Sequence, residues 1–158
     1  MYRRILVPVD GSATSTLGVR HALALAKDQH ARVRVLSVVD EMAVLSMIYG
    51  YPADVTTVID SMRDTGKKAI AEAGALARKA GVRADTTIVE GRGRVVSQAI
   101  LDEAKKFRAD LIVMGTHGRR GVNRLLLGSD AERVLREAPV PVLLVREQQA
   151  KRARAPKK

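Results

Sequence analysis

The stretch 109–129 reads ADLIVMGTHGRRGVNRLLLGS, and the order of its residue types decides the fold class. Residues 109–114 are a short apolar run typical of a buried strand, and the segment 115–128 that follows is rich in glycine. A helix is predicted over 129–138, where Pro139 bounds it. A strand that passes through a loop into a helix is one step of the β-α alternation typical of parallel sheets.

The same alternation continues on both sides of this stretch. Strands are predicted over 3–9, 32–39, 82–90, 109–114 and 140–145, and helices over 14–29, 56–80, 94–107 and 129–138. Five strands and four helices in strict alternation predict a three-layer α/β/α fold with a five-stranded parallel sheet. Pro141 indicates that the last strand lies at an edge. Such sheets bind ligands beyond the carboxyl ends of their strands, here residues 9–10, 38–40 and 114–115.

Composition excludes several classes of protein. The 158 residues suit one domain, and an aromatic content of 3% implies a core of Val, Ile, Leu and Ala. The chain has no cysteine, which excludes disulfides, thiolate catalysis and cysteine zinc sites. Five apolar residues between Arg4 and Asp10 are too few for a signal peptide, and no apolar run approaches the roughly 20 residues of a membrane span. We therefore expect a cytoplasmic protein with no membrane partner.

The net charge of +11 is unevenly distributed. Five positive charges lie in the last eight residues, and we expect the polar tail 147–158 to be mobile and solvated rather than bound to nucleic acid or to an acidic partner. The rest of the chain is moderately basic, which suits a polyphosphate ligand and does not demand nucleic acid.

The glycines of the loop follow the pattern G-x2-G-x9-G-[ST], formed by Gly115, Gly118, Gly128 and Ser129. Phosphate oxygens need several convergent N–H donors, and glycine lacks the side chain that would block their approach. The helix beginning near Ser129 adds N–H groups and a favourable dipole. Cationic side chains of the loop could neutralise phosphate charge; they are Arg119, Arg120 and Arg124. Alternatively, the glycines shape a surface loop and Ser129 merely caps a helix.

Over essentially all of 1–146, the chain resembles the ATP-binding branch of the universal stress protein family. Four stretches carry the likeness: ILVPVDGS at 5–12, MGTHG at 114–118, GSDAERVL at 128–135 and APVPVLLV at 138–145. The resemblance implies one domain over 1–146 with a Rossmann-like, adenine nucleotide α-hydrolase-like fold. Its sheet order would be 3-2-1-4-5, with strands 1 and 4 adjacent at the centre. It also implies a homodimer through the last strand, 140–145, which would otherwise expose an apolar edge.

The same resemblance assigns roles to residues around an ATP whose phosphates could also hold Mg²⁺ or Mn²⁺. Residues 8–10 would line the adenine and ribose region, and the backbone at Val38 or Val39 would contact the adenine edge. Gly115 would approach the ribose, and the residues from Gly118 to the N–H of Asp130 would hold the phosphates. The predicted binding residues are Pro8, Val9, Asp10, Val38, Val39, Met114, Gly115, His117, Gly118, Arg119, Gly128, Ser129 and Asp130.

Several of these residues have alternative interpretations. Asp10 could bind ribose or a metal ion, or it could cap the helix that begins near Ser12. His117 could contact phosphate or move protons, or it could simply be exposed in its loop. Asp130 stands where the resemblance implies an uncharged residue; it could weaken ATP binding, ligate Mg²⁺, or point away and favour the helix N-terminus. Residues 42–51 could form a lid, a partner surface or a loop over the sheet edge.

Three functional hypotheses follow. The first is a nucleotide-binding stress-response protein whose bound ATP changes its shape or its dimer contacts, with an unidentified protein partner. The second is a dimeric interaction module that has the fold but binds no nucleotide. The third, an enzyme of the wider adenine nucleotide α-hydrolase-like group such as a ligase half, is the weakest because the short chain leaves no room for a second substrate domain. The sequence also shows no general base aimed at a water and no lysine in a Walker arrangement. We therefore expect a binding protein with slow ATP hydrolysis at most.

Overall fold

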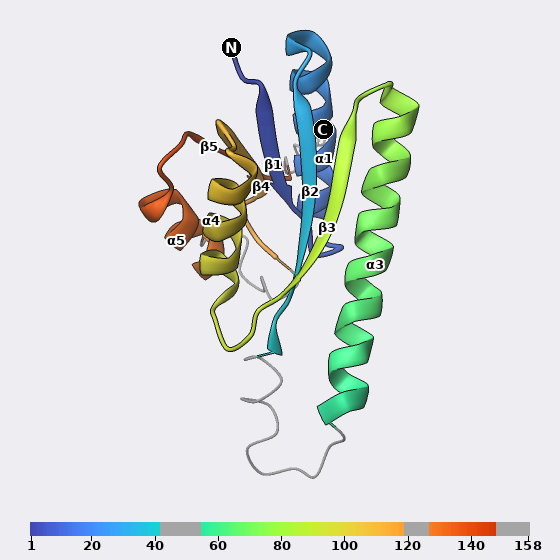
Figure 1. Ribbon diagram of the computed structural model, residues 1–158, viewed down its shortest axis with the longest axis vertical. Coiled ribbons are helices and arrows are strands. Elements are labelled where there is room, and N and C mark those ends of the chain that lie inside the picture. The colour runs from blue at the N-terminus through green and yellow to red at the C-terminus, as the bar shows by residue number, and fades with distance from the viewer. Residues whose placement is uncertain (42–54, 119–126, 148–158) are drawn as a thin grey trace, which may run out of the picture.

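The structure, a computed structural model, describes residues 1–41, 55–118 and 127–147. Strands and helices alternate along the chain in these ranges, as the sequence predicts (Figure 1). The elements are β1 (Arg4–Pro8), α1 (Ala13–Gln29), β2 (Arg32–Val39), α3 (Val55–Ala80), β3 (Ala84–Glu90), α4 (Val96–Phe107), β4 (Leu111–Gly115), α5 (Ser129–Glu137) and β5 (Val142–Val145). Residues 42–51, predicted as a lid, partner surface or loop, lie outside the described residues.

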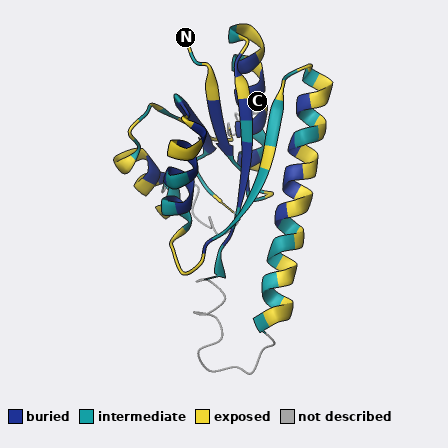
Figure 2. Ribbon diagram, in the orientation of Figure 1, coloured by how far each residue is buried: buried dark blue, intermediate teal, exposed yellow. Residues whose placement is uncertain are grey.

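The five strands form one parallel sheet in the order β3-β2-β1-β4-β5, which confirms the order implied by the resemblance. Helices α1 and α3 cover one face, and α4 and α5 cover the other (Figure 1). Successive strand residues point to opposite faces, so Ile5 packs with the α1 and α3 side chains while Leu6 packs with those of α4 and α5. The central strands are therefore buried on both faces (Figure 2).

Strands β1 and β4 are joined at their amino ends and separate toward their carboxyl ends. They pair at Ile5–Leu111 and Leu6–Ile112. Before these pairs, the Asp110 carboxylate accepts hydrogen bonds from the backbone N–H groups of Arg3 and Arg4, at 2.8 and 2.9 Å. Beyond them, each strand follows its outer neighbour, because Val9 N donates to Leu36 O at 2.7 Å and Thr116 N donates to Val145 O at 2.9 Å. The sheet consequently opens between β1 and β4.

Glycine and proline set several element boundaries. Helix α3 ends before Gly81, whose φ of 68° suits a residue without a side chain, as predicted for a C-terminal stop. Strand β5 begins after Pro141 and lies at the sheet edge, which confirms the interpretation of that proline. The Pro141 carbonyl accepts from Ile112 N at 3.0 Å, so the proline still contributes an acceptor beside β4. In the described ranges, no helix is long and apolar enough to cross a membrane.

We expect Ile112→Ala to lower the free energy of unfolding by about 2–5 kcal/mol, because it removes a fully buried side chain from the centre of the sheet and leaves a cavity. The matched control is Thr86→Ala, at an exposed residue of β3, which should cost less than about 1 kcal/mol. Urea denaturation followed by circular dichroism measures both values. Equal effects of the two substitutions would contradict the assigned core.

Candidate functional site

A cavity of about 280 Å³ lies where β1 and β4 separate. Its walls come from the carboxyl ends of β1, β2 and β4, the first turn of α5 and the apolar side of α4. The lining residues are Pro8, Val9, Asp10, Ser15, Leu36, Val38, Asp40, Val96, Ile100, Met114, Gly115, Thr116, His117, Gly118, Gly128, Ser129, Asp130 and Ala131. Residues that are up to 123 positions apart in the sequence, Pro8 and Ala131, therefore share one cavity.

Most residues predicted from the sequence line this cavity. They are Pro8, Val9, Asp10, Val38, Met114, Gly115, His117, Gly118, Gly128, Ser129 and Asp130. Val39 does not line it: this side chain is buried, and its carbonyl accepts from Gly91 N at 3.0 Å. Of the two β2 residues proposed to contact adenine, Val38 is thus the one that faces the cavity. Arg119, together with Arg120 and Arg124, lies outside the described residues.

Other lining residues were not predicted, and they extend the apolar part of the cavity. Leu36 precedes Val38 by two positions on β2, so strand alternation could have placed both on one face. Val96 and Ile100 lie on α4, and their four-residue spacing marks one face of a helix. This face of α4 is turned toward the cavity because α4 and α5 pack on the same side of the sheet. Asp40 belongs to the strand end 38–40 that the sequence already indicated, and the remaining unpredicted lining residues are Ser15, Thr116 and Ala131.

Asp10 orders the turn between β1 and α1. Its Oδ1 accepts hydrogen bonds from Ser12 N at 3.0 Å and from Ser12 Oγ at 2.6 Å. Ser12 is itself the N-cap of α1 and accepts from Ser15 N, so Asp10 supports the cap without occupying that position. Thr14 Oγ1 lies 3.2 Å from Ser12 Oγ and donates to the His117 carbonyl at 2.6 Å. This series of contacts ties the β1–α1 turn to the segment after β4.

The motif glycines are required by contacts with these same residues. A Cβ atom at Gly118 would lie 2.7 Å from Asp10 Oδ2, and one at Gly115 would lie 3.0 Å from Thr14 atoms. A Cβ at Gly128 would lie 3.2 Å from Thr116 O, which also accepts a hydrogen bond from Gly128 N at 2.9 Å. None of the three has a positive φ, so close packing and not backbone conformation selects glycine there. The loop's glycines thus fit the protein's own interior as well as a ligand.

His117 is half-buried and faces the cavity, so the expectation of a merely exposed loop histidine is wrong. Its Nδ1 lies 2.9 Å from Thr116 Oγ1. Its Nε2 is buried and has no hydrogen-bond partner in the described part of the chain. A buried polar atom without a partner is costly, so Nε2 is suited to a ligand that supplies one.

At the start of α5, Gly128 is the N-cap and makes no side-chain cap bond, and Ser129 is the first helical residue. The alternative in which Ser129 caps this helix is therefore wrong. Asp130 lines the cavity, and its Oδ1 accepts from Ser97 N at 3.1 Å in the first turn of α4. One interpretation of the sequence was that Asp130 favours the N-terminus of its own helix, α5. The hydrogen bond from Ser97 N shows that Asp130 supports the N-terminus of the neighbouring helix, α4. The first N–H groups of α5 have no intrahelical acceptors and form a favourable place for an anion.

The carboxylates of Asp10, Asp40 and Asp130 all line the cavity. Within the described ranges, however, no group of three or more His, Asp or Glu side chains is arranged to hold a metal ion. A divalent cation would therefore need ligand oxygens, such as those of a polyphosphate, in addition to protein carboxylates. This chemistry fits the expectation that Mg²⁺ or Mn²⁺ would be held through phosphates.

Known proteins are similar to this chain over most of its length. A universal stress protein of Methanocaldococcus jannaschii is 38% identical over 149 residues, covering 93% of this chain and 84% of the relative. A universal stress protein family structure from Burkholderia pseudomallei is 34% identical with a TM-score of 0.72, covering 90% of this chain and 95% of that one. A universal stress protein solved in complex with cAMP is 25% identical with a TM-score of 0.64, covering 92% and 97%. The model of the universal stress protein family matches residues 1–146, and the chain belongs to that family.

Proposed function

We propose that this protein binds an adenine nucleotide, ATP in particular, in the cavity between β1 and β4, and that it acts as a nucleotide-dependent regulator in a stress response. The observation that carries the proposal is the arrangement of the cavity. Asp10, the segment 114–118 and the first residues of α5 line it together. That is where open parallel sheets bind nucleotides, with phosphates at a helix N-terminus.

The lining of the cavity combines apolar and polar groups, as a nucleotide requires. Apolar side chains from β2 and α4 offer a surface for a flat base; they are Leu36, Val38, Val96 and Ile100. Glycine backbone and the start of α5 also line the cavity and offer N–H groups to phosphate oxygens. The related protein solved with cAMP supports an adenine nucleotide as the ligand class.

We further propose that binding, not rapid hydrolysis, is the activity. The described lining of the cavity contains no lysine that could bridge the β- and γ-phosphates as a Walker lysine does. Asp10, the carboxylate nearest the glycines, has its Oδ1 engaged by Ser12, which fits a structural or ribose-binding role better than that of a general base. A cytoplasmic location remains a prediction from the sequence.

An apolar edge supports the proposed homodimer. Leu143 of β5 is 38% exposed and Leu135 of α5 is 48% exposed, which are high values for large aliphatic side chains. β5 is the edge strand on this side of the sheet, so its unpaired backbone groups could bond to a second β5. The exposed edge at β5 equally favours the second candidate function, a dimeric interaction module that binds no nucleotide. Measuring nucleotide binding distinguishes the two functions.

Gly118→Ala should weaken ATP binding at least about tenfold, because the new Cβ would displace the Asp10 carboxylate or enter the cavity. The matched control is Gly74→Ala in α3, where a Cβ meets other atoms at 3.7 Å or more and the cavity is distant. Isothermal titration calorimetry with ATP and Mg²⁺ measures both affinities. If the unaltered protein binds no adenine nucleotide, the nucleotide proposal fails and the interaction module gains support.

Leu143→Glu should convert a dimer to a monomer at micromolar concentration, since it would bury a charge in the proposed interface. Thr86→Glu places the same side chain at an exposed residue of the opposite edge strand, β3, and should leave the dimer intact. Sedimentation velocity distinguishes the two states. A monomeric unaltered protein, or dissociation by Thr86→Glu alone, would count against an interface at β5.

A further inference from the structure

Asp130 places a negative charge at the end of the cavity that would receive phosphate. It is the second residue of α5, after the N-cap Gly128, and it lines the cavity together with Ser129. The N-terminus of a helix attracts anions through its N–H groups and its dipole. A carboxylate of the helix itself at that position repels a second anion in the same place. The attraction of α5 for phosphate is therefore partly opposed from within the site.

The carboxylate is held in this position by a second helix. Its Oδ1 accepts from Ser97 N at 3.1 Å, in the first turn of α4. Val95, the N-cap of α4, makes no side-chain cap bond, so Asp130 provides the acceptor that a capping side chain would otherwise provide. Moving the carboxylate away from the cavity would cost α4 that bond. The charge consequently stays beside the ligand instead of turning into solvent.

We propose that Asp130 determines how strongly the site discriminates among AMP, ADP and ATP. This inference rests on the proposed binding of adenine nucleotides and specifies which of them the site favours. Each added phosphoryl group increases the negative charge of the ligand, and the repulsion from a fixed carboxylate grows with that charge. Asp130 thus lowers the affinity for ATP more than that for AMP and leaves the affinity for uncharged adenosine unaltered. The ratio of the affinity for ATP to the affinity for AMP is therefore smaller than it would be without this carboxylate.

The test compares Asp130→Asn with the unaltered full-length protein by calorimetry, using adenosine, AMP and ATP, each with EDTA and with Mg²⁺. Asparagine keeps an oxygen that can accept from Ser97 N, so the support of α4 is retained while the charge is removed. In EDTA, the variant should bind AMP about threefold and ATP about tenfold more tightly, with adenosine unchanged. With Mg²⁺, which neutralises part of the phosphate charge, the gain for ATP should shrink.

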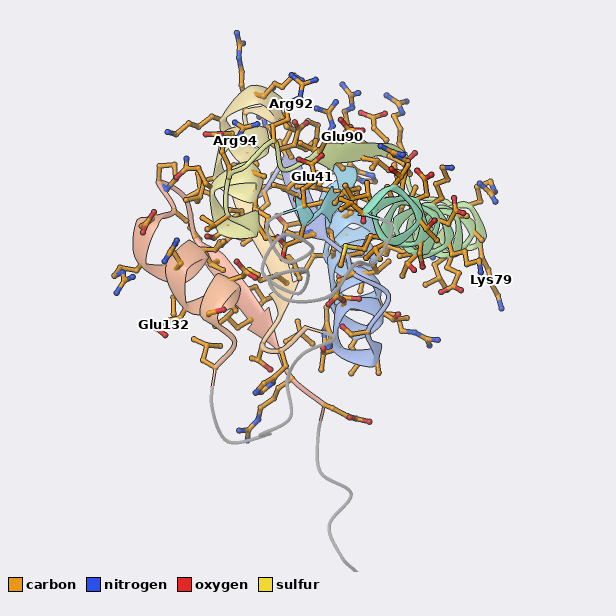
Figure 3. All side chains as sticks on the ribbon, turned by 90° about the horizontal axis from the view of Figure 1, so that it is seen from below. Glu41, Lys79, Glu90, Arg92, Arg94 and Glu132 are labelled. Atoms are coloured by element: carbon orange, nitrogen blue, oxygen red, sulfur yellow. The ribbon has the colours of Figure 1, made fainter. Side chains whose placement is uncertain are left out.

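The matched control is Glu132→Gln, which removes an equal charge from the same turn of α5. The Glu132 side chain is 62% exposed, does not line the cavity and lies at the periphery of the molecule (Figure 3). It should leave the ratio of ATP to AMP affinity within about twofold of the original, because solvent screens an exposed charge. An equal change of that ratio in both variants would show a general helix effect and would overturn the role of Asp130.

Other results would overturn the proposal in distinguishable ways. If Asp130→Asn weakens ATP binding in Mg²⁺, the carboxylate helps to hold the cation. If it shifts adenosine, AMP and ATP by the same factor, Asp130 acts through the position of α4 and not through charge. An unchanged ratio of ATP to AMP affinity would show that the carboxylate does not affect the phosphates. Absence of binding of all three ligands by the unaltered protein would remove the proposed function itself.

Discussion

The separation of β1 from β4 is the constraint on which the site depends. The two strands are joined at Ile5–Leu111 and Leu6–Ile112, and the Asp110 carboxylate fastens their amino ends through two backbone N–H groups. Farther along, hydrogen bonds carry β1 toward β2 and β4 toward β5. Beyond these pairs, the outward-facing backbone groups of both strands stay bonded to β2 and β5, which holds each strand in the sheet while the opening forms between them. A cavity can therefore form at the centre of the sheet, where both faces are covered by helices.

The glycine motif fits close packing at the same positions that the proposed nucleotide site would use, which makes it informative about the fold. The absence of side chains at Gly115, Gly118 and Gly128 allows the loop to lie against Thr14, Asp10 and Thr116. The Thr14 hydroxyl then bonds to the His117 carbonyl, which holds the β1–α1 turn and the loop in one arrangement. The backbone is thereby positioned before any ligand arrives, and preorganisation of this kind reduces the ordering cost of binding.

The sequence predicted the alternation of strands and helices because each element repeats a local pattern, and its boundaries followed from residues such as Gly81 and Pro141. Its strand ends and its glycine loop are local features and lie at the cavity, whereas the roles of individual lining residues came from the family resemblance. The sheet order came from the family resemblance, because alternation alone does not specify which strands are neighbours. Val96 and Ile100 were missed for a related reason: a helix face has a direction in space that depends on the whole topology. The bond between Ser97 and Asp130 joins residues 33 positions apart, beyond any local pattern.

Asp130 belongs to α5 but accepts a hydrogen bond from α4, so the N–H donors at the starts of the two helices have different surroundings. One donor of α4 is satisfied inside the protein by the Asp130 carboxylate, whereas the first turn of α5 faces the cavity. The two neighbouring N-termini are consequently not equivalent as anion sites, and the proposed place for a phosphate is at α5. The carboxylate that creates this asymmetry also lines the cavity, so in the proposed complex it would oppose that phosphate. The same carboxylate thus stabilises the start of α4 and, in the proposed complex, would lower the affinity for an anion. The residue at position 130 therefore links the packing of the two helices to the charge of the ligand that the site would accept.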